Sequence, residues 1–136
     1  MLPIGFTWES KPGVTVIGDA AHVMVPFAGE GANLSMADAM HLASWILKSK
    51  DKEELEENVR RFEQEMWKRM KPGQQCSWDN MRDMFFTEGA PGTVIERYLT
   101  RMVTLMAGNV AGTLAGVGIY AYYGWTKLLR SSGFGV

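Results

Sequence analysis

The segment GDAAHVMVPFAGEGAN, residues 18–33, is the feature that most constrains how this chain can fold. It follows residues 14–17, a run of β-branched and mostly apolar side chains that predicts a strand buried on both faces. It precedes a segment in which apolar residues recur at helical spacing. A chain that passes from a strand to a helix through so many small residues leaves its backbone open to a ligand. The alternative is a plain tight turn with a helix cap.

The residues of this turn suit an electron-rich ligand. The start of the following helix has unpaired backbone N–H groups and partial positive charge, which stabilise a carbonyl or a developing anion. Gly29 and Gly31 would let a flat ligand approach the backbone without a Cβ in the way. Pro26 offers a rigid face, and Asp19, at the end of the predicted strand, can accept a hydrogen bond from a polyol hydroxyl.

Three helices are predicted after the turn. The first covers about residues 31–49, the second residues 51–71, ended by Pro72-Gly73, and the third about residues 74–86. The apolar stripes that predict the first two helices are Met36, Met40, Ala43 and Leu47, and Leu55, Val59, Phe62, Met66 and Met70. Charged pairs four residues apart predict a solvated face on the second helix: Glu56–Arg60, Glu57–Arg61 and Glu65–Arg69.

The stretch GDAAHVMVPFAGEGANLSMADAMHLA resembles the second flavin-binding motif of FAD-dependent monooxygenases of the aromatic-hydroxylase type, a group that includes tetracycline-inactivating and fungal secondary-metabolite enzymes. The family pattern is Gly-Asp-Ala-Ala-His, then Pro, then Gly-x-Gly-x-Asn opening a helix. Every element is present: Gly18, Asp19, Ala20, Ala21, His22, Pro26, Gly29, Gly31 and Asn33. The resemblance covers about residues 2–86 and corresponds to the C-terminal part of a family member.

This resemblance implies roles for individual residues. The implied cofactor-binding residues are Gly18, Asp19, Pro26, Gly29, Gly31, Ala32 and Asn33. Asp19 would bond the ribityl chain of FAD, Pro26 would lie beside the isoalloxazine ring, and the backbone of residues 29–33 would face the pyrimidine edge of the flavin. No metal site is implied.

No catalytic residue is assigned by the motif. Asp19, His22 and Glu30 are the candidates for acid–base work, because all three lie on one predicted loop. His22 is expected to be a structural hydrogen-bonding residue rather than a base. Glu30 stands where family members often carry Gln, and its charge is expected to point away from a reduced flavin.

The chain departs from the family by lacking the opening βαβ unit with G-x-G-x-x-G, which holds the ADP part of FAD. The predicted fold is therefore mainly α with a short β segment. It is a partial FAD-binding α/β fold over residues 1–90 without the N-terminal βαβ unit, followed by a helical region over residues 91–136. We expect the isolated chain to bind FAD weakly or not at all and to lack redox activity by itself.

The predicted function is that of a fragment or derivative of an FAD-dependent monooxygenase, which uses NAD(P)H and O2 to oxygenate a small organic substrate, such as a secondary metabolite. The alternative is a repurposed pocket module without FAD, which binds or isomerises a metabolite or serves as a partner subunit. The net charge of −1 gives no case for nucleic acid as a partner. The single cysteine, Cys76, and the absence of a signal-like N-terminus predict a cytoplasmic location.

Residues 102–125 contain no charged side chain and are flanked by Arg97 and Arg101 on one side and Lys127 and Arg130 on the other. Glycines four residues apart form a ridge along which helices can approach closely: Gly108, Gly112 and Gly116. We predict one helix that hides its apolar surface on something other than the first half of the chain. The candidates are a membrane, a second copy of the chain in a homo-oligomer, or the rest of a monooxygenase.

Overall fold

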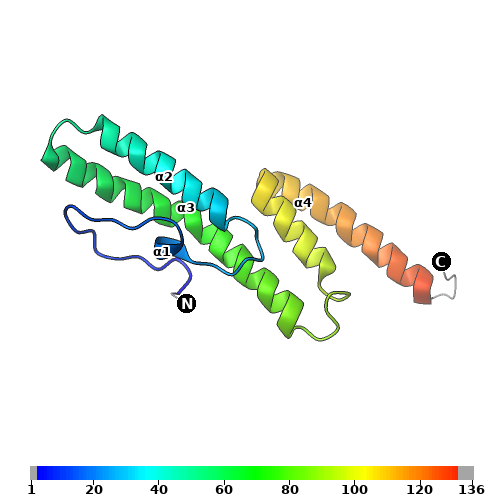
Figure 1. The fold of residues 1–136 in the computed structure, drawn as a ribbon. Coiled ribbons are helices and arrows are strands. Elements are labelled where there is room, and N and C mark those ends of the chain that lie inside the picture. Colours follow the sequence, from blue (N-terminus) through cyan, green and yellow to red (C-terminus); the bar gives the residue numbers. More distant parts are fainter. Residues whose placement is uncertain (1–2, 132–136) are drawn as a thin grey trace. The chain divides into compact units, whose positions relative to one another are not determined.

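The computed structural model describes residues 3–131, which form four helices and no β-strand (Figure 1). In chain order they are α1 (Asp19–His22), α2 (Gly31–Lys48), α3 (Lys52–Phe86) and α4 (Ile95–Ser131). The chain divides into two compact units, Met1–Trp78 and Asp79–Val136. The boundary between these units falls inside α3.

The first unit is built on the buried face of α3. Phe62 and Met66 have no exposed surface and pack with Ala21 of α1. Partly buried side chains surround them: Trp8, Ile17, Leu42, Trp45 and Trp67. The apolar spacing that predicts this helix therefore also identifies the side that packs, because residues three and four apart share one helix face.

The prediction of a strand at residues 14–17 is wrong, because no strand forms anywhere within residues 3–131. Only an isolated antiparallel bridge between Lys11 and Val14 forms there. A strand exists only when a neighbour accepts its backbone hydrogen bonds, and no other segment of the described chain supplies one. Val14 and Val16 consequently remain 58% and 40% exposed, although their residue types suit a buried sheet.

The prediction that Pro72-Gly73 ends a helix is also wrong, because α3 continues through Pro72 to Phe86. Proline removes one backbone donor and disfavours an uninterrupted helix, so packing around this point must compensate. Gly73 is buried, and a Cβ there would lie 3.2 Å from Cδ1 of Leu34 on α2. The Gly5 N–H donates to Oε1 of Gln74 at 2.9 Å. These contacts hold the part of α3 that directly follows the proline.

The predicted helix at residues 31–49 is confirmed as α2, but its packed side was not predicted. The apolar stripe that indicated the helix faces outward, with Met36, Met40 and Leu47 between 59% and 85% exposed. The inward side carries Asp38 and Leu42 instead. The first unit therefore leaves an apolar side of α2 uncovered.

In the second unit, the apolar segment is a helical hairpin rather than one helix. α4 reverses at Gly108, whose φ of 84° and ψ of 172° are not helical. The arm before it, residues 95–107, lies antiparallel to the arm after it, residues 109–131 (Figure 1). A Cβ on Gly112 would lie 1.9 Å from Oγ1 of Thr104, so the arms touch at this point. The glycine ridge was correctly expected to allow close approach, but it joins two arms of the same segment.

Candidate functional site

Gly18 begins the turn of residues 18–33 in a conformation that only glycine adopts readily. Its φ is 62° and its ψ is −143°. Its N–H donates to Oδ2 of Asp38 at 3.0 Å. A Cβ at this position would lie 2.9 Å from Oγ of Ser35, so α2 packs directly against the turn. The backbone entering α1 is therefore fixed by two residues of α2.

Asp38 is the centre of a buried ionic cluster that we call the Asp38 cluster: Gly18, His22, Asp38 and Arg69. Nε2 of His22 lies 2.6 Å from Oδ2 of Asp38, and Nη2 of Arg69 lies 2.8 Å from Oδ1. Both His22 and Asp38 are only 1% exposed. Burial raises the pKa of the Asp38 carboxyl, but hydrogen bonds from Arg69, from Gly18 and from His22 outweigh it and hold this pKa below its ordinary value. The ionised carboxylate therefore joins α1, α2 and α3.

A second contact fixes the same turn near its middle. The N–H of Phe27 donates to Oγ of Ser77 at 3.2 Å, and the Ser77 hydroxyl is hydrogen-bonded to the carbonyl oxygen of Val25. Ser77 is fully buried on α3, and Ala28 is 3% exposed. Residues 18–28 are thus held at both ends by buried polar side chains.

The remaining predicted cofactor-binding residues lie at the surface. Exposed side chains or backbone are found at Asp19, Pro26, Gly29, Ala32 and Asn33, and Gly31 is half-buried. No other segment of residues 3–131 comes within 4 Å of where a Cβ would stand on Gly29 or Gly31. Within the part of the chain that the structure describes, no side chain caps the start of α2 and its first turn carries no acidic residue. This helix start is open to a ligand that accepts hydrogen bonds.

The three candidate acid–base residues occupy different environments. His22 is buried against Asp38, whereas Asp19 is exposed and Glu30 is half-buried just before α2. Among residues 3–131, no hydrogen bond joins any two of these three side chains. The geometry therefore makes His22 part of the support of the turn and leaves Asp19 available to a ligand.

Sequence reasoning missed the supporting residues Asp38, Arg69 and Ser77. Arg69 was expected to pair with Glu65 on a solvated helix face, but it reaches Asp38, and Glu65 accepts a hydrogen bond from the indole of Trp45 at 3.3 Å. A signal was present, because Asp38 is the one acidic residue in the largely apolar and small sequence LSMADAMHLA. An acidic residue in such a setting is buried only when it is paired.

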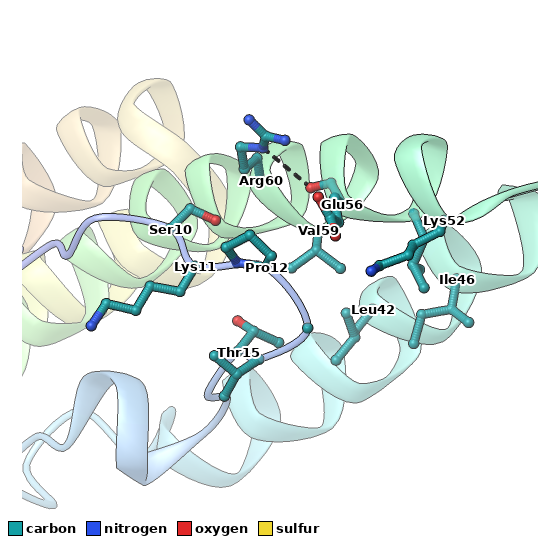
Figure 2. Close-up of a pocket in the computed structure, with 13 residues that line it drawn as sticks. Ser10, Lys11, Pro12, Thr15, Leu42, Ile46, Lys52, Glu56, Val59 and Arg60 are labelled. Atoms are coloured by element: carbon teal, nitrogen blue, oxygen red, sulfur yellow. Dashed lines mark hydrogen bonds between the residues drawn. The ribbon is translucent and has the colours of Figure 1, made fainter.

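A cavity of about 340 Å³ lies elsewhere in the first unit, between the loop at residues 10–15, α2 and α3 (Figure 2). Its walls are largely apolar. The apolar lining residues include Pro12, Val14, Leu42, Ile46, Leu55 and Val59, and the charged ones are Lys11, Lys52, Glu56 and Arg60. None of the predicted cofactor-binding residues lines it. The surface turn and the cavity are therefore separate features.

Comparison with known proteins relates the turn to a cofactor. Residues 8–69 match the FAD binding domain family. The chain is 31% identical over 107 residues to monooxygenase penA of Penicillium thymicola, a match covering 71% of this chain and 25% of the relative. It is 33% identical over 92 residues to kynurenine 3-monooxygenase of Stenotrophomonas maltophilia, covering 68% of this chain and 20% of the relative. It is 42% identical over 65 residues to FAD-dependent monooxygenase cctM of Talaromyces islandicus, a match covering 46% of this chain and 16% of the relative.

The chain thus spans a quarter or less of the length of these relatives. No solved structure matches it. The family match includes the whole turn at residues 18–33, α2 and the Asp38 cluster. Residues 8–69 of this chain are homologous to part of the FAD-binding domain of FAD-dependent monooxygenases.

Proposed function

We propose that this chain forms the flavin-facing part of an FAD-dependent monooxygenase that oxygenates a small organic substrate with NAD(P)H and O2. The observation that carries this proposal is the turn of residues 18–33. Its backbone donates hydrogen bonds to the buried side chains of Asp38 and Ser77, and its backbone is uncovered at Gly29 and Gly31. A site that binds a flat cofactor needs both properties, because the protein has to position the group without filling its space.

The residues present fit a flavin. The exposed carboxylate of Asp19 can accept hydrogen bonds from the hydroxyls of a ribityl chain. The uncapped start of α2 can donate backbone hydrogen bonds to the electron-rich pyrimidine edge and stabilise negative charge there. When bound, FAD would supply the redox chemistry, taking electrons from NAD(P)H and reacting with O2. The chain would orient the ring and stabilise its charge.

The uncovered apolar surfaces of the first unit support a larger assembly. Val14 and Val16 have the residue types of a buried strand but lack a partner strand, and Met36 and Met40 face outward from α2. A parallel sheet covered on both faces would bury such positions. We propose that residues 14–17 become a strand when the remainder of a monooxygenase FAD domain, in the same or another polypeptide, adds its sheet.

Complementation tests this function. The chain is mixed with FAD and with the part of an FAD-dependent monooxygenase that it does not match, and flavin retained through gel filtration is measured. We expect retention with both polypeptides, loss with Asp19→Ala, and no loss with Glu9→Ala, which removes an exposed loop carboxylate away from the turn. Flavin that stays unbound in the complemented mixture would contradict the proposal. The chain alone should retain little or none.

The cavity favours a second function, the binding of a small apolar metabolite without FAD. Its volume of about 340 Å³ lies within the range of small-ligand pockets, and its walls are largely apolar. Titration with 1-anilinonaphthalene-8-sulfonate, a fluorescent anion whose aromatic rings bind apolar sites, tests this. Binding that is abolished by Val59→Phe, which fills the cavity, and unaffected by Asp19→Ala would support it. Equal binding by both variants would show that the cavity is not the binding site.

A further inference from the structure

α1 is a single helical turn of four residues, Asp19–His22, and is too short to be stable by itself. The N–H groups of Ala21 and His22 both donate to the carbonyl oxygen of Gly18 at 2.9 Å. Isolated helices shorter than about 12 residues are marginal in water even when their residues favour helix. Contacts from outside α1 therefore have to hold this turn, and with it the direction of its first side chain, Asp19.

One oxygen atom of Asp38 holds α1 at both ends. Oδ2 accepts the N–H of Gly18, which precedes α1, at 3.0 Å, and lies 2.6 Å from Nε2 of His22, the last residue of α1. The pKa of the Asp38 carboxyl is lowered, so the carboxylate is ionised at neutral pH and Nε2 carries the proton of this bond. We call these two contacts of one oxygen the Oδ2 clip.

The other oxygen of Asp38 makes a separate connection. Oδ1 accepts a hydrogen bond from Nη2 of Arg69 at 2.8 Å, and this ion pair joins α2 to α3 without involving α1. A buried ion pair is weak evidence for a role in stability, because apolar residues of similar volume often stabilise a protein as well. Within residues 3–131, the contacts of Oδ2 go to α1 and to the residue before it, so what they determine is the position of α1.

The Oδ2 clip fixes the backbone from which Asp19 projects. Gly18 has a φ of 62°, and a Cβ there would lie 2.9 Å from Oγ of Ser35, so α2 packs closely against this end of the turn. At the other end, the His22 side chain has no exposed surface, and its Nδ1 has no hydrogen-bond partner in the described chain. Asp19 lies between these anchors, is exposed, and has a carboxylate without a hydrogen bond within residues 3–131. Its direction is thus set by the anchors and not by contacts of its own.

We propose that Asp38 is the positioning residue for the carboxylate of Asp19, and that the Oδ2 clip makes the site select flavins that carry a polyol chain. This inference rests on the proposed function, in which Asp19 accepts hydrogen bonds from the ribityl hydroxyls. A hydroxyl and a carboxylate oxygen have to meet at about 2.5–2.7 Å for a strong hydrogen bond, so a carboxylate on an unanchored turn would lose it. Asp38 is 1% exposed and acts through Gly18 and His22.

Equilibrium flavin binding tests this role in the mixture of the chain with the remainder of a monooxygenase. The ligands are FAD and lumiflavin, which has the flavin ring but no ribityl chain. We expect Asp38→Asn to raise the Kd for FAD about tenfold, as for the loss of one hydrogen bond to a charged group, because the amide has one oxygen for the donors of both α1 and α3. The Kd for lumiflavin should not change. In the Asp19→Ala background, Asp38→Asn should add no further loss, because both residues act on the same hydrogen bond.

Substitutions at His22 keep the test valid if Asp38→Asn does not fold. His22→Met removes one contact of the Oδ2 clip, so it should weaken FAD binding and spare lumiflavin. His22→Gln should restore FAD binding, because its amide N–H can donate to the same oxygen. The matched control is Glu63→Gln, at another fully buried carboxylate on α3, whose hydrogen bonds come from Trp8 and Thr15 and not from α1. It should leave the Kd for FAD unchanged, whatever it does to stability.

Three results would overturn the inference while the proposed function stands. The first is an unchanged Kd for FAD in both Asp38→Asn and His22→Met. The second is a loss of lumiflavin binding equal to the loss of FAD binding, and the third is additive losses from Asp38→Asn and Asp19→Ala. No flavin binding by the unmodified mixture would instead refute the proposed function, and the role of the Oδ2 clip with it.

Discussion

The chain contains two antiparallel helix pairs that are joined by different chemistry. α2 and α3 are linked by the buried carboxylate of Asp38. This carboxylate accepts hydrogen bonds from the side chains of Arg69 and His22 and from the backbone N–H of Gly18. In the two arms of α4, glycines pack against threonines. Gly112 lies against Thr104, and Gly116 lies against Thr100. The α2–α3 pair depends on a buried charge, whereas the α4 pair depends on close packing at glycines and has a partly exposed ion pair, Lys127 with Glu96, between its arms.

The difference bears on what each pair leaves free. An ionic centre has directional contacts, so it fixes the backbone of Gly18 and the path of the turn that we assign to the flavin. Small residues let two helices approach without covering their outer faces, so the longer arm of the hairpin keeps large apolar side chains exposed, among them Val110, Leu114 and Val117. The first pair positions a site, and the second presents a surface.

Removing the charge should damage the first pair most. We expect Asp38→Asn to lower the free energy of unfolding by about 3–5 kcal/mol, because Arg69 and His22 would face a neutral amide in a buried site. Urea unfolding followed by tryptophan fluorescence measures this effect. The matched control, Glu57→Gln, removes an exposed i,i+4 pair with Arg61 and should change stability by at most about 0.5 kcal/mol. Equal effects of the two substitutions would refute a special role for Asp38.

Adding one methyl group should separate the arms of the second pair. A Cβ on Gly112 would meet Thr104 at 1.9 Å, so we expect Gly112→Ala to destabilise α4 by about 1–3 kcal/mol. Amide hydrogen exchange in detergent would show faster exchange in both arms. Gly118→Ala is the control, because no other segment of residues 3–131 comes within 4 Å of its Cβ position, and it should stabilise the helix by up to about 1 kcal/mol. Similar protection in both variants would mean that the arms do not pack as described.

Patterns within short stretches of sequence were enough to predict α2, the turn before it and the buried face of α3. The helix at residues 31–48 and the turn before it followed from small residues and apolar spacing within a short window. The buried face of α3 followed from one stripe, because Phe62, Met66 and Met70 recur at helical spacing and are all at most 1% exposed. The predicted cofactor-binding residues all belong to one short motif, residues 18–33, which is why a local pattern was enough to name them.

The features that sequence reasoning missed depend on distant partners. Residues 14–17 have strand-forming side chains, but a strand requires a neighbour that residues 3–131 do not provide. Arg69 lies 31 residues from Asp38, and a nearer partner, Glu65, was expected instead. The glycines of α4 each permit a bend, and spacing alone does not tell that Gly108 reverses the chain while Gly112 and Gly116 pack. Pro72 likewise remains helical through contacts with other segments.

Lowering the pH should weaken the Asp38 cluster, but it should lower the free energy of unfolding by less than Asp38→Asn does. The pKa of Asp38 is lowered in the folded chain from its ordinary 3.8, chiefly because its hydrogen bonds, led by that from Arg69, outweigh the opposing effect of burial. Its stabilisation is therefore complete above pH 3.8 and is lost as the pH falls through the lower folded value, at about 1.4 kcal/mol for each unit of difference. The pKa of Glu96 at the open end of the α4 hairpin is also lowered, by the hydrogen bond from Lys127. Because that lysine is 56% exposed, salt should screen this second contribution.

Urea unfolding between pH 5 and pH 2.5, at low and at high salt, separates the two contributions. In high salt, the stability difference between the unmodified chain and Asp38→Asn should shrink as the pH falls, because protonated Asp38 and asparagine are both neutral. A difference that stays constant down to pH 2.5 would mean that Asp38 keeps its charge throughout, or that its charge contributes nothing to the α2–α3 pair. The effect of Lys127→Met should shrink with salt at pH 5, which the buried Asp38 cluster should resist.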